Sequence, residues 1–421
     1  MKKLILFVII SATSLLLSAQ DVKTIYKQSS INLVADTNFG QGNDWNTIFS
    51  SYNESMYNHH IGKRKSLVVL PNGSVIVSHV YKNYYTKFSA TGEFVKEFGV
   101  IGKNGKKIKE LEQIACVLNN ETLVTIADKM GTVYCLDFDG NLKKTLKLNY
   151  SVRKIIAIGK DKIAVVGFSI WKNKLRDFVS IVDYNTNKEK IIWDCFTESS
   201  TPSTKTFNYT HKLASGGSLS ISTANAYEKA DAITPRISYI NNKLIIAIAI
   251  TGDILTFDTT GKQISKDKLN WTPKTISVAK IIEKQKKAIA QMKDDKYSFF
   301  GPITITDEIQ KIKAKFAVQM EADLKLIKEP VNLPVISTII NDNKNNLLIF
   351  EYPTADNDNK FGVWVYDNGG KVVGRSSFTC NNFDLEIIPS KMVFHNGYLY
   401  SLQNIKNANG IPMRLVRFKL Q

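Results

Sequence analysis

The sequence predicts an all-β fold made of repeated four-stranded sheets, and three observations support this. Residues 65–148 contain the same pattern twice: strand, tight turn, strand, loop, strand, tight turn, strand. The pattern then recurs along the chain with a period of about 40 residues, which is the length of a four-stranded propeller blade. The last repeat holds only three strands, and an unassigned strand-like segment precedes the first repeat.

The first two repeats show how the turns specify the hairpins. The first copy runs from Lys65 to Phe98 and has Asn72-Gly73 in its first turn; the second runs from Gln113 to Leu148 and has Asn119-Asn120 and Asp139-Gly140 in its turns. Asn and Gly tolerate the positive φ angles that short hairpin loops require. Each turn therefore has a physical basis, and each repeat is expected to be an antiparallel sheet.

Four further repeats follow, over residues 154–193, 237–269, 335–378 and 385–420. A final sheet of three strands would leave an open edge that can pair with other chains. We expect an N-terminal strand from residues 22–34 to supply its fourth strand. The fold class predicted is thus an all-β, six-bladed β-propeller over residues 20–421, with the N-terminal strand closing the last blade.

The departures from the period all fall on one type of connection. In a four-stranded antiparallel blade, the loop between strands two and three and the loop to the next blade lie on the same face of the disc. The long insertions occupy these loops, at residues 169–177, 197–234, 270–334, 353–362 and 404–412. Loops on a rigid scaffold often carry function, so we expect this insertion-bearing face to be the working face.

The largest insertion, residues 270–334, changes to a helical period between blades four and five. One helix is expected to place Val278, Ile281, Ile282, Ile289 and Met292 on one face, and a second, capped by Thr306, to carry Ile309, Ile312, Phe316 and Met320. Two interpretations stay open: a helical hairpin packed over the edge of the ring, or a lid or partner-docking arm. The Ser- and Thr-rich insertion at 197–234 is expected to form an extended hairpin.

The N-terminus has the three regions of a secretory signal peptide. Lys2 and Lys3 precede an apolar stretch from Leu4 to Leu17, and Ser18-Ala19 follow it. The alternative is a membrane anchor, but the apolar stretch is shorter than the ~20 residues that a spanning helix needs. We expect residues 1–19 to be removed, leaving a periplasmic or extracellular protein with no membrane span.

The net charge bears on the partners to expect, and the spacing of the cysteines bears on disulfides and metals. The formal net charge is +18, which would attract an anionic partner in the cell envelope, but a basic surface that is simply solvated is the favoured interpretation. The lysines are spread along the chain and no nucleic-acid motif is present, so a nucleic-acid partner is not expected. The four cysteines, Cys116, Cys135, Cys195 and Cys380, have no metal-binding spacing and are expected to be free thiols. No metal site and no cofactor are predicted.

Charged residues lie near the starts of the first strands of several blades, where the blades converge at the axial mouth. They are Arg64, Glu112, Arg153, Arg236 and Glu386, and the aromatic residues Trp171 and Tyr352 lie in or beside loops of the same face. Such a ring could bind an anionic or sugar ligand or supply an acid and a base. The alternative is a set of ordinary ion pairs around a pore. Two weaker motifs, His59-His60 and Asp356 to Asn359, lack the spacing of a metal site.

The segment Tyr85 to Gly99, followed by Ile101 to Gly105, resembles the blade sequence of secreted six-bladed β-propellers of the NHL and TolB-like groups, above all those common in Bacteroidetes. The resemblance implies a binding or assembly role. We therefore expect a non-catalytic protein that binds a protein or glycan of the cell envelope through its insertion-bearing face, with no catalytic residue assigned. The alternative is a hydrolase or lyase that acts at the axial mouth. The sequence does not indicate an oligomeric state.

Overall fold

The computed structural model describes most of the chain from residue 25 to the C-terminus. The described ranges are 25–49, 66–79, 84–101, 105, 107–108, 113–126, 131–172, 174–197, 206–214, 216–224, 234–269, 271–294, 306–352, 360–367, 369–407 and 411–421. The expected signal peptide at residues 1–19 lies outside these ranges, as do His59, His60 and the motif from Asp356 to Asn359.

Strands dominate the described residues, and most belong to antiparallel sheets of four strands in chain order. The first sheet contains β2 (Leu67–Val69), β3 (Val75–His79), β4 (Tyr84–Phe88) and β5 (Phe94–Phe98), and the second contains β8 (Gln113–Leu118), β9 (Thr122–Ile126), β10 (Thr132–Leu136) and β11 (Leu142–Lys147). The third contains β12 (Ser151–Ile158), β13 (Lys162–Trp171), β14 (Lys174–Asp183) and β15 (Glu189–Thr197), and the fourth contains β18 (Arg236–Ile240), β19 (Lys243–Ile248), β20 (Asp253–Asp258) and β21 (Gln263–Lys268). A small pair, β6 (Val100–Ile101) and β7 (Lys107–Ile108), follows the first sheet.

The tight turns match their sequences. Asn119 and Asn120 have φ angles of 47° and 57°, and Asn241 and Asn242 have φ angles of 50° and 58°. Two successive positive φ angles are the signature of the type I′ turn, whose twist suits a two-residue hairpin.

The remaining large sheet joins the two ends of the chain. It combines a fifth unit, β24 (Thr338–Asn341), β25 (Leu347–Phe350), β26 (Lys360–Tyr366) and β27 (Val372–Thr379), with β28 (Phe383–Asp384), β29 (Met392–His395), β30 (Tyr398–Ile405), β31 (Met413–Leu420) and β1 (Ile31–Ala35). As expected, the N-terminal strand pairs antiparallel with the C-terminal strand, with Leu33 opposite Leu420. It also pairs parallel with β27, where Ile31 lies opposite Phe378.

The described segment before β1 also packs against the ring. Tyr26 is buried, and its hydroxyl donates to Asp342 Oδ2 at 3.0 Å. Gly374 packs so closely beneath this segment that a Cβ atom there would lie 2.1 Å from the Tyr26 carbonyl oxygen. The described segment before β1 is therefore built into the fifth sheet unit.

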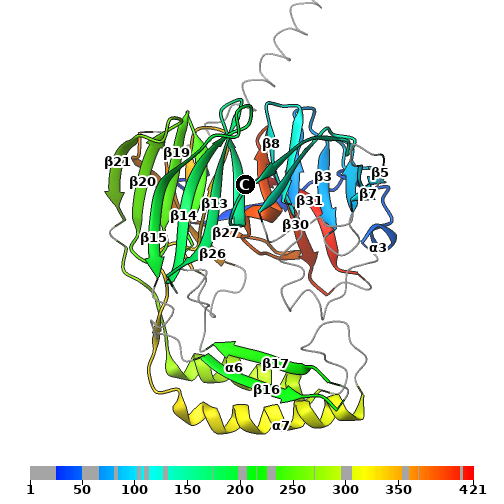
Figure 1. The fold of residues 1–421 in the computed structure, drawn as a ribbon, viewed down its shortest axis with the longest axis vertical. Helices are drawn as coiled ribbons and strands as arrows, with labels where there is room; N and C mark the ends of the chain where they lie inside the picture. The colour runs from blue at the N-terminus through cyan, green and yellow to red at the C-terminus, as the bar shows by residue number, and fades with distance from the viewer. Residues whose placement is uncertain are drawn as a thin grey trace, which may run out of the picture.

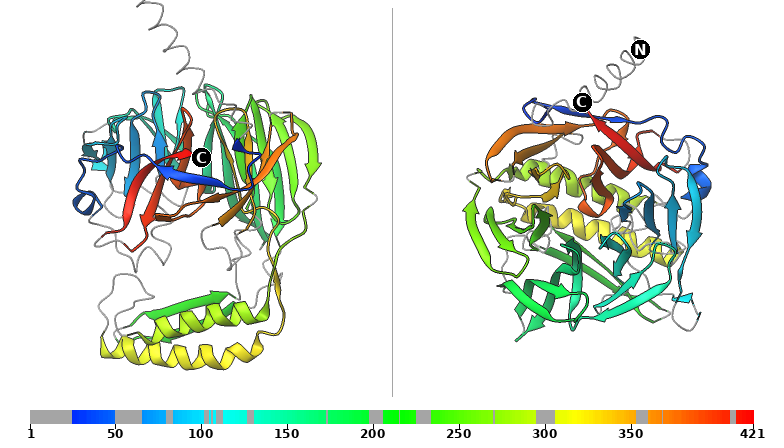
Figure 2. Two further views of the ribbon diagram at one scale, coloured as in Figure 1. Left: turned by 180° about the vertical axis from the view of Figure 1, so that it is seen from behind. Right: turned by 90° about the horizontal axis from the view of Figure 1, so that it is seen from above.

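The sheets stand around a common axis in the manner of a β-propeller, as Figure 2 shows in the view from above. Apolar clusters fill the spaces between adjacent sheets: Val165 and Ile155 of the third sheet pack with Val124 and Val133 of the second, and Ala164 packs with Ile246 of the fourth. Each sheet thus buries its two faces against its neighbours, which a lone sheet of this size could not do.

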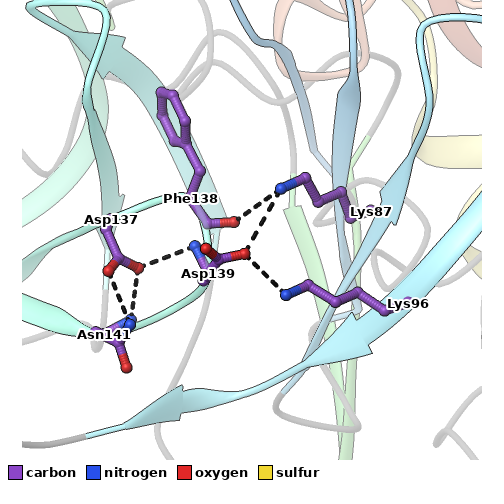
Figure 3. Close-up of polar contacts among 6 residues, drawn as sticks. All are labelled: Lys87, Lys96, Asp137, Phe138, Asp139 and Asn141. Atoms are coloured by element: carbon purple, nitrogen blue, oxygen red, sulfur yellow. Dashed lines mark hydrogen bonds and ion pairs between the residues drawn. The ribbon is translucent and has the colours of Figure 1, made fainter.

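Polar contacts reinforce these junctions at the turns between the third and fourth strands (Figure 3). In the second sheet, Asp137 Oδ1 accepts from the backbone N–H groups of Asp139 and Asn141, both at 2.9 Å. From the first sheet, Lys96 Nζ lies 2.8 Å from Asp139 Oδ1, and Lys87 Nζ lies 3.4 Å from the Phe138 carbonyl oxygen.

The same contact recurs around the ring. A cation of one sheet donates to a turn carbonyl of the next: Lys144 to Tyr184, Lys162 to Thr259, Lys190 to Thr260, and Arg417 of the last sheet to Ala90 of the first. Part of the basic charge noted in the sequence is therefore used to join neighbouring sheets.

One expectation for the third sheet was wrong. Residues 169–177 were expected to form a loop, but β13 and β14 continue through them as a hairpin, with Ser169 opposite Arg176 and Trp171 opposite Lys174. Lys172, with a φ angle of 48°, lies in the tight turn that joins the strands. Charged and small side chains in this stretch suggested a loop, but they suit a strand whose end is exposed.

The two largest insertions form a separate layer on the insertion-bearing face (Figure 1). The first supplies β16 (Thr206–Lys212) and β17 (Ser218–Ala224), which pair antiparallel as expected for a hairpin. The second supplies α6 (Val278–Lys293), α7 (Asp307–Asp323) and the short 3₁₀ helix η2 (Leu324–Leu326), between the strands β22 (Thr275–Ile276) and β23 (Val331–Asn332). We call β16, β17, α6 and α7 the accessory module.

The module has its own apolar core. Tyr209 of β16 packs with Ile289 and Met292 of α6 and with Phe316 and Met320 of α7. The Thr306 hydroxyl accepts from the Ile309 N–H at 3.3 Å and begins α7, as expected. Two arrangements of the helices were left open, a hairpin over the edge of the ring and a lid or docking arm. Neither placed the apolar helix faces on the β16–β17 hairpin, where they pack because the first insertion supplies a matching apolar surface.

Candidate functional site

A pocket of about 270 Å³ lies where the accessory module joins the fifth sheet unit. We call the two chain segments that make this junction, residues 271–277 and 331–336, the neck. Residues of the neck line one side of the pocket, and residues of β26, β27 and the end of β25 line the other: Trp271, Thr272, Pro273, Lys274, Pro334, Val335, Glu351, Tyr352, Trp364 and Arg375. The neck belongs to the insertion-bearing face, and Trp364 and Arg375 lie within strands of the ring.

Glu351 organises the polar side of the pocket. It directly follows β25, and its backbone N–H donates to the Gly362 carbonyl at 2.9 Å. Its Oε1 atom accepts from Trp364 Nε1 at 2.8 Å and from Arg375 Nη2 at 2.9 Å. Its Oε2 atom lies 2.7 Å from Lys274 Nζ, so one carboxylate connects the neck to two strands of the ring.

Burial alone would raise the pKa of the Glu351 carboxyl. The hydrogen bonds from Lys274 and Trp364 and the positive charges of Lys274 and Arg375 outweigh the burial, and the pKa lies below its ordinary value. Glu351 is therefore ionised at neutral pH. Gly362 makes room for it, since a Cβ atom there would lie 2.9 Å from Glu351 Oε2.

Two tryptophans form the apolar side of the pocket. The rings of Trp271 and Trp364 stack with centroids 5.1 Å apart and planes 25° from parallel. The guanidinium of Arg375, the residue opposite Trp364 in the sheet, lies 4.9 Å from the Trp364 ring centroid. Stacked rings beside cations and a carboxylate can bind a ligand that has both an apolar face and polar groups.

Two of the predicted site residues lie at this junction. Tyr352 lines the pocket and packs in an apolar cluster with Ile276 and Leu333 of the neck. Arg236, at the start of β18, has its Nη2 atom 3.5 Å from the Tyr352 hydroxyl and donates from Nε to the Ser337 carbonyl at 2.9 Å. The structure thus brings Arg236 and Tyr352 together.

The other predicted residues are not part of the pocket lining. Arg153 lies 3.4 Å from the buried Asp177 and stacks on Phe168, while Glu386 pairs with the buried Lys391 at 2.9 Å. Trp171, 57% exposed, ends β13 of the third sheet. Arg64 and Glu112 lie outside the described residues.

Five residues of the pocket were not among the predicted site residues: Trp271, Lys274, Glu351, Trp364 and Arg375. No local pattern unites them, because Trp271 and Lys274 precede Glu351, Trp364 and Arg375 by 77 residues or more in the chain. The alternation of Phe361, Val363 and Val365 as buried residues does place Trp364 on the opposite face of β26. The position of Trp364 on the less buried face of β26 was the one feature of the sequence that could have indicated a site there.

Three further properties of the described residues concern metal ions, cysteines and membrane-spanning helices. No cluster of three or more His, Cys, Asp or Glu side chains arranged to hold a metal ion occurs in the part of the chain that the structure describes. All four cysteines are free, and burial raises the pKa of each thiol. Among the helices described, none has the length and hydrophobicity needed to span a membrane.

Comparisons with known proteins give distant structural matches. No family model and no curated protein sequence matches this chain. A member of the DUF4221 family from Bacteroides vulgatus is similar in structure, with a TM-score of 0.47 and 12% identity over 94% of this chain and 99% of that one. A catalytically inactive virginiamycin B lyase from Staphylococcus aureus with quinupristin has a TM-score of 0.37 and 10% identity, over 93% and 99% of the two chains. BamB from Moraxella catarrhalis has a TM-score of 0.35 and 14% identity, over 83% of each chain.

Proposed function

We propose that this chain is a non-catalytic, exported β-propeller that binds a glycan of the cell envelope through its insertion-bearing face. The observation that carries the proposal is the pocket at the neck, where the stacked rings of Trp271 and Trp364 lie beside Lys274, Glu351 and Arg375. Aromatic rings that pack on apolar faces, together with charged hydrogen-bonding groups, suit carbohydrate better than a flat protein surface.

The proposal includes six blades, the last closed by β1, and a helical insertion between the fourth and fifth. The sheet order supports this count, because β24–β27 and the group β29, β30, β31 and β1 each have the four strands of the other units. The resemblance of the segment Tyr85 to Gly99 to secreted propellers of Bacteroidetes supports the export of the chain by the signal peptide at residues 1–19.

The contacts of the axial charges favour binding over catalysis. Arg153, Arg236 and Glu386 were candidates for an acid and base at the axial mouth, but each has a separate neighbour: Asp177, the Ser337 carbonyl and Lys391, respectively. The hydrolase or lyase alternative gains no support from these residues.

The test uses the mature chain, residues 20–421, and immobilised polysaccharides. We expect saturable binding to acidic polysaccharides such as polygalacturonate and lipopolysaccharide, and none to neutral dextran, at 0.15 M salt. Part of the binding should persist at 0.5 M salt, where attraction between exposed charges is screened. Failure to bind any of a broad set of envelope glycans would overturn the proposal, and release of shortened or unsaturated products would overturn its non-catalytic part.

A further inference from the structure

We propose that the pocket at the neck binds one acidic sugar residue, a hexuronate unit, with its ring against the tryptophan pair and its carboxylate at Arg375 and Lys274. This inference rests on the proposed function and names the ligand class of the same site. Four properties of the pocket lead to it: its size, its aromatic side, the direction of its charges and the firmness of its frame.

The size of the pocket fits a single ring. Pockets for drug-sized molecules have volumes of roughly 300–1,000 Å³. The pocket at the neck, at about 270 Å³, lies just under that range. It has room for one monosaccharide unit with ordered water, while the neighbouring units of a chain would lie over the exposed residues Thr272 and Pro273 at its rim.

The aromatic side offers a surface for the apolar C–H face of a sugar ring. Trp271 and Trp364 are both half-buried, so each ring is held in place while part of it stays accessible. The indole N–H of Trp364 is already used, since it donates to Glu351. The rings therefore contribute packing area, and the polar recognition falls to the charged side chains.

The carboxylate of the pocket is buried and its two cations are more exposed. The Glu351 side chain is only 9% exposed, whereas those of Lys274 and Arg375 are 36% and 59% exposed. The carboxylate thus lies inside and the two cations face outward, so a ligand meets positive charge. The guanidinium has five N–H donors and the ammonium three; one from each contacts Glu351, which leaves donors for a ligand carboxylate.

The frame is held from both sides before a ligand arrives. Trp364 and Arg375 are directly opposite each other on β26 and β27, and Lys274 comes from the neck, which is fixed to the ring by the cluster of Ile276, Leu333 and Tyr352. A site whose groups are already positioned loses less conformational entropy on binding, which favours recognition of a small ligand.

The experiment compares glucuronate with glucose by saturation-transfer NMR and calorimetry on the mature chain. Glucuronate should bind, and glucose should bind at least about tenfold more weakly, because it cannot form a charge-assisted hydrogen bond. Arg375→Gln should remove most of this preference while leaving the weak glucose signal. Trp271→Ala should weaken both sugars about tenfold through loss of the stacking surface.

Trp171→Ala is the matched control, because Trp171 is an exposed tryptophan of the third sheet that does not line the pocket. It should leave both affinities unchanged. If Trp271→Ala does not fold, Arg375→Gln and Lys274→Gln at exposed positions still decide the question. Equal affinity for the two sugars, or Arg375→Gln without effect, would overturn the inference. Acidic polysaccharide binding that persists in all three pocket variants would overturn this inference alone and leave the proposed function standing.

Discussion

Glu351→Gln is the most informative single change, because one carboxylate connects the neck to β26 and β27. The amide keeps one acceptor oxygen, which can serve Trp364, but it replaces the second carboxylate oxygen with an NH₂ group that faces a cation. A hydrogen bond to a charged group contributes about 1.5–3 kcal/mol, and exposure of the cations reduces this. We expect the free energy of unfolding to fall by about 2 kcal/mol.

The assay is urea unfolding followed by tryptophan fluorescence, since Trp271 and Trp364 lie beside the altered group. Glu283→Gln on α6 is the matched control, because Glu283 is 65% exposed and pairs only with Lys287 on the same helix among the contacts described. It should change the free energy of unfolding by less than about 0.5 kcal/mol. If Glu351→Gln were as stable as this control, the carboxylate would not be what joins neck and ring.

The same carboxylate predicts a pH dependence. The pKa of Glu351 in the folded protein lies below the ordinary value of 4.5. A carboxyl with a lowered pKa stabilises the folded state fully above its unfolded pKa, and this contribution is lost as the pH falls through the folded value. Wild-type protein should therefore lose more stability than Glu351→Gln between pH 5 and lower pH. Parallel stability curves for the two proteins would contradict this reasoning.

Three further predictions concern the packing of the ring and of the accessory module. Gly374→Ala should displace the N-terminal segment, since the added Cβ atom would collide with the Tyr26 carbonyl, and limited proteolysis should then cleave near residue 30 faster than in wild type. Asp137→Ala, which removes two backbone hydrogen bonds, should cost about 1–2 kcal/mol in urea unfolding, whereas Asp139→Ala, which removes exposed ion pairs, should cost less than about 1 kcal/mol (Figure 3); equal costs would refute the distinction. Phe316→Ala should cost about 3–5 kcal/mol within the accessory module, so hydrogen exchange should rise in α6 and α7 and not in β8–β11; a uniform rise would mean that module and ring unfold together.

Much of the fold could be predicted because its determinants are local. Asn119 and Asn120 form their own turn, and the alternation of apolar residues in β26 marks its buried face. The pairing of the N-terminal strand with β31 could also be inferred, because a three-stranded last repeat leaves an edge that needs a partner.

The site could not be predicted, because it depends on contacts between distant segments. Trp271 begins an insertion and Trp364 lies in a strand of another repeat, and only packing brings their rings together. Arg153 and Glu386 were predicted as site residues because they lie near the starts of the first strands, which converge at the axial mouth. Arg236 was selected for the same reason, and Tyr352 was selected because it lies in or beside a loop of the insertion-bearing face. These two residues do meet, with Arg236 Nη2 3.5 Å from the Tyr352 hydroxyl.

The accessory module illustrates the same limit. Each insertion was expected to form its own elements, and β16, β17, α6 and α7 occur where they were predicted. That Tyr209 of one insertion would pack on Phe316 of the other could not be inferred, since the two are separated by the whole of the fourth sheet.

A crystal structure of the mature chain soaked with glucuronate tests the central claim most directly. We predict that the sugar lies in the pocket at the neck, with its ring against Trp271 or Trp364 and its carboxylate within hydrogen-bond distance of Arg375 or Lys274. Ordered glucuronate elsewhere on the ring, with the pocket at the neck empty, would contradict it.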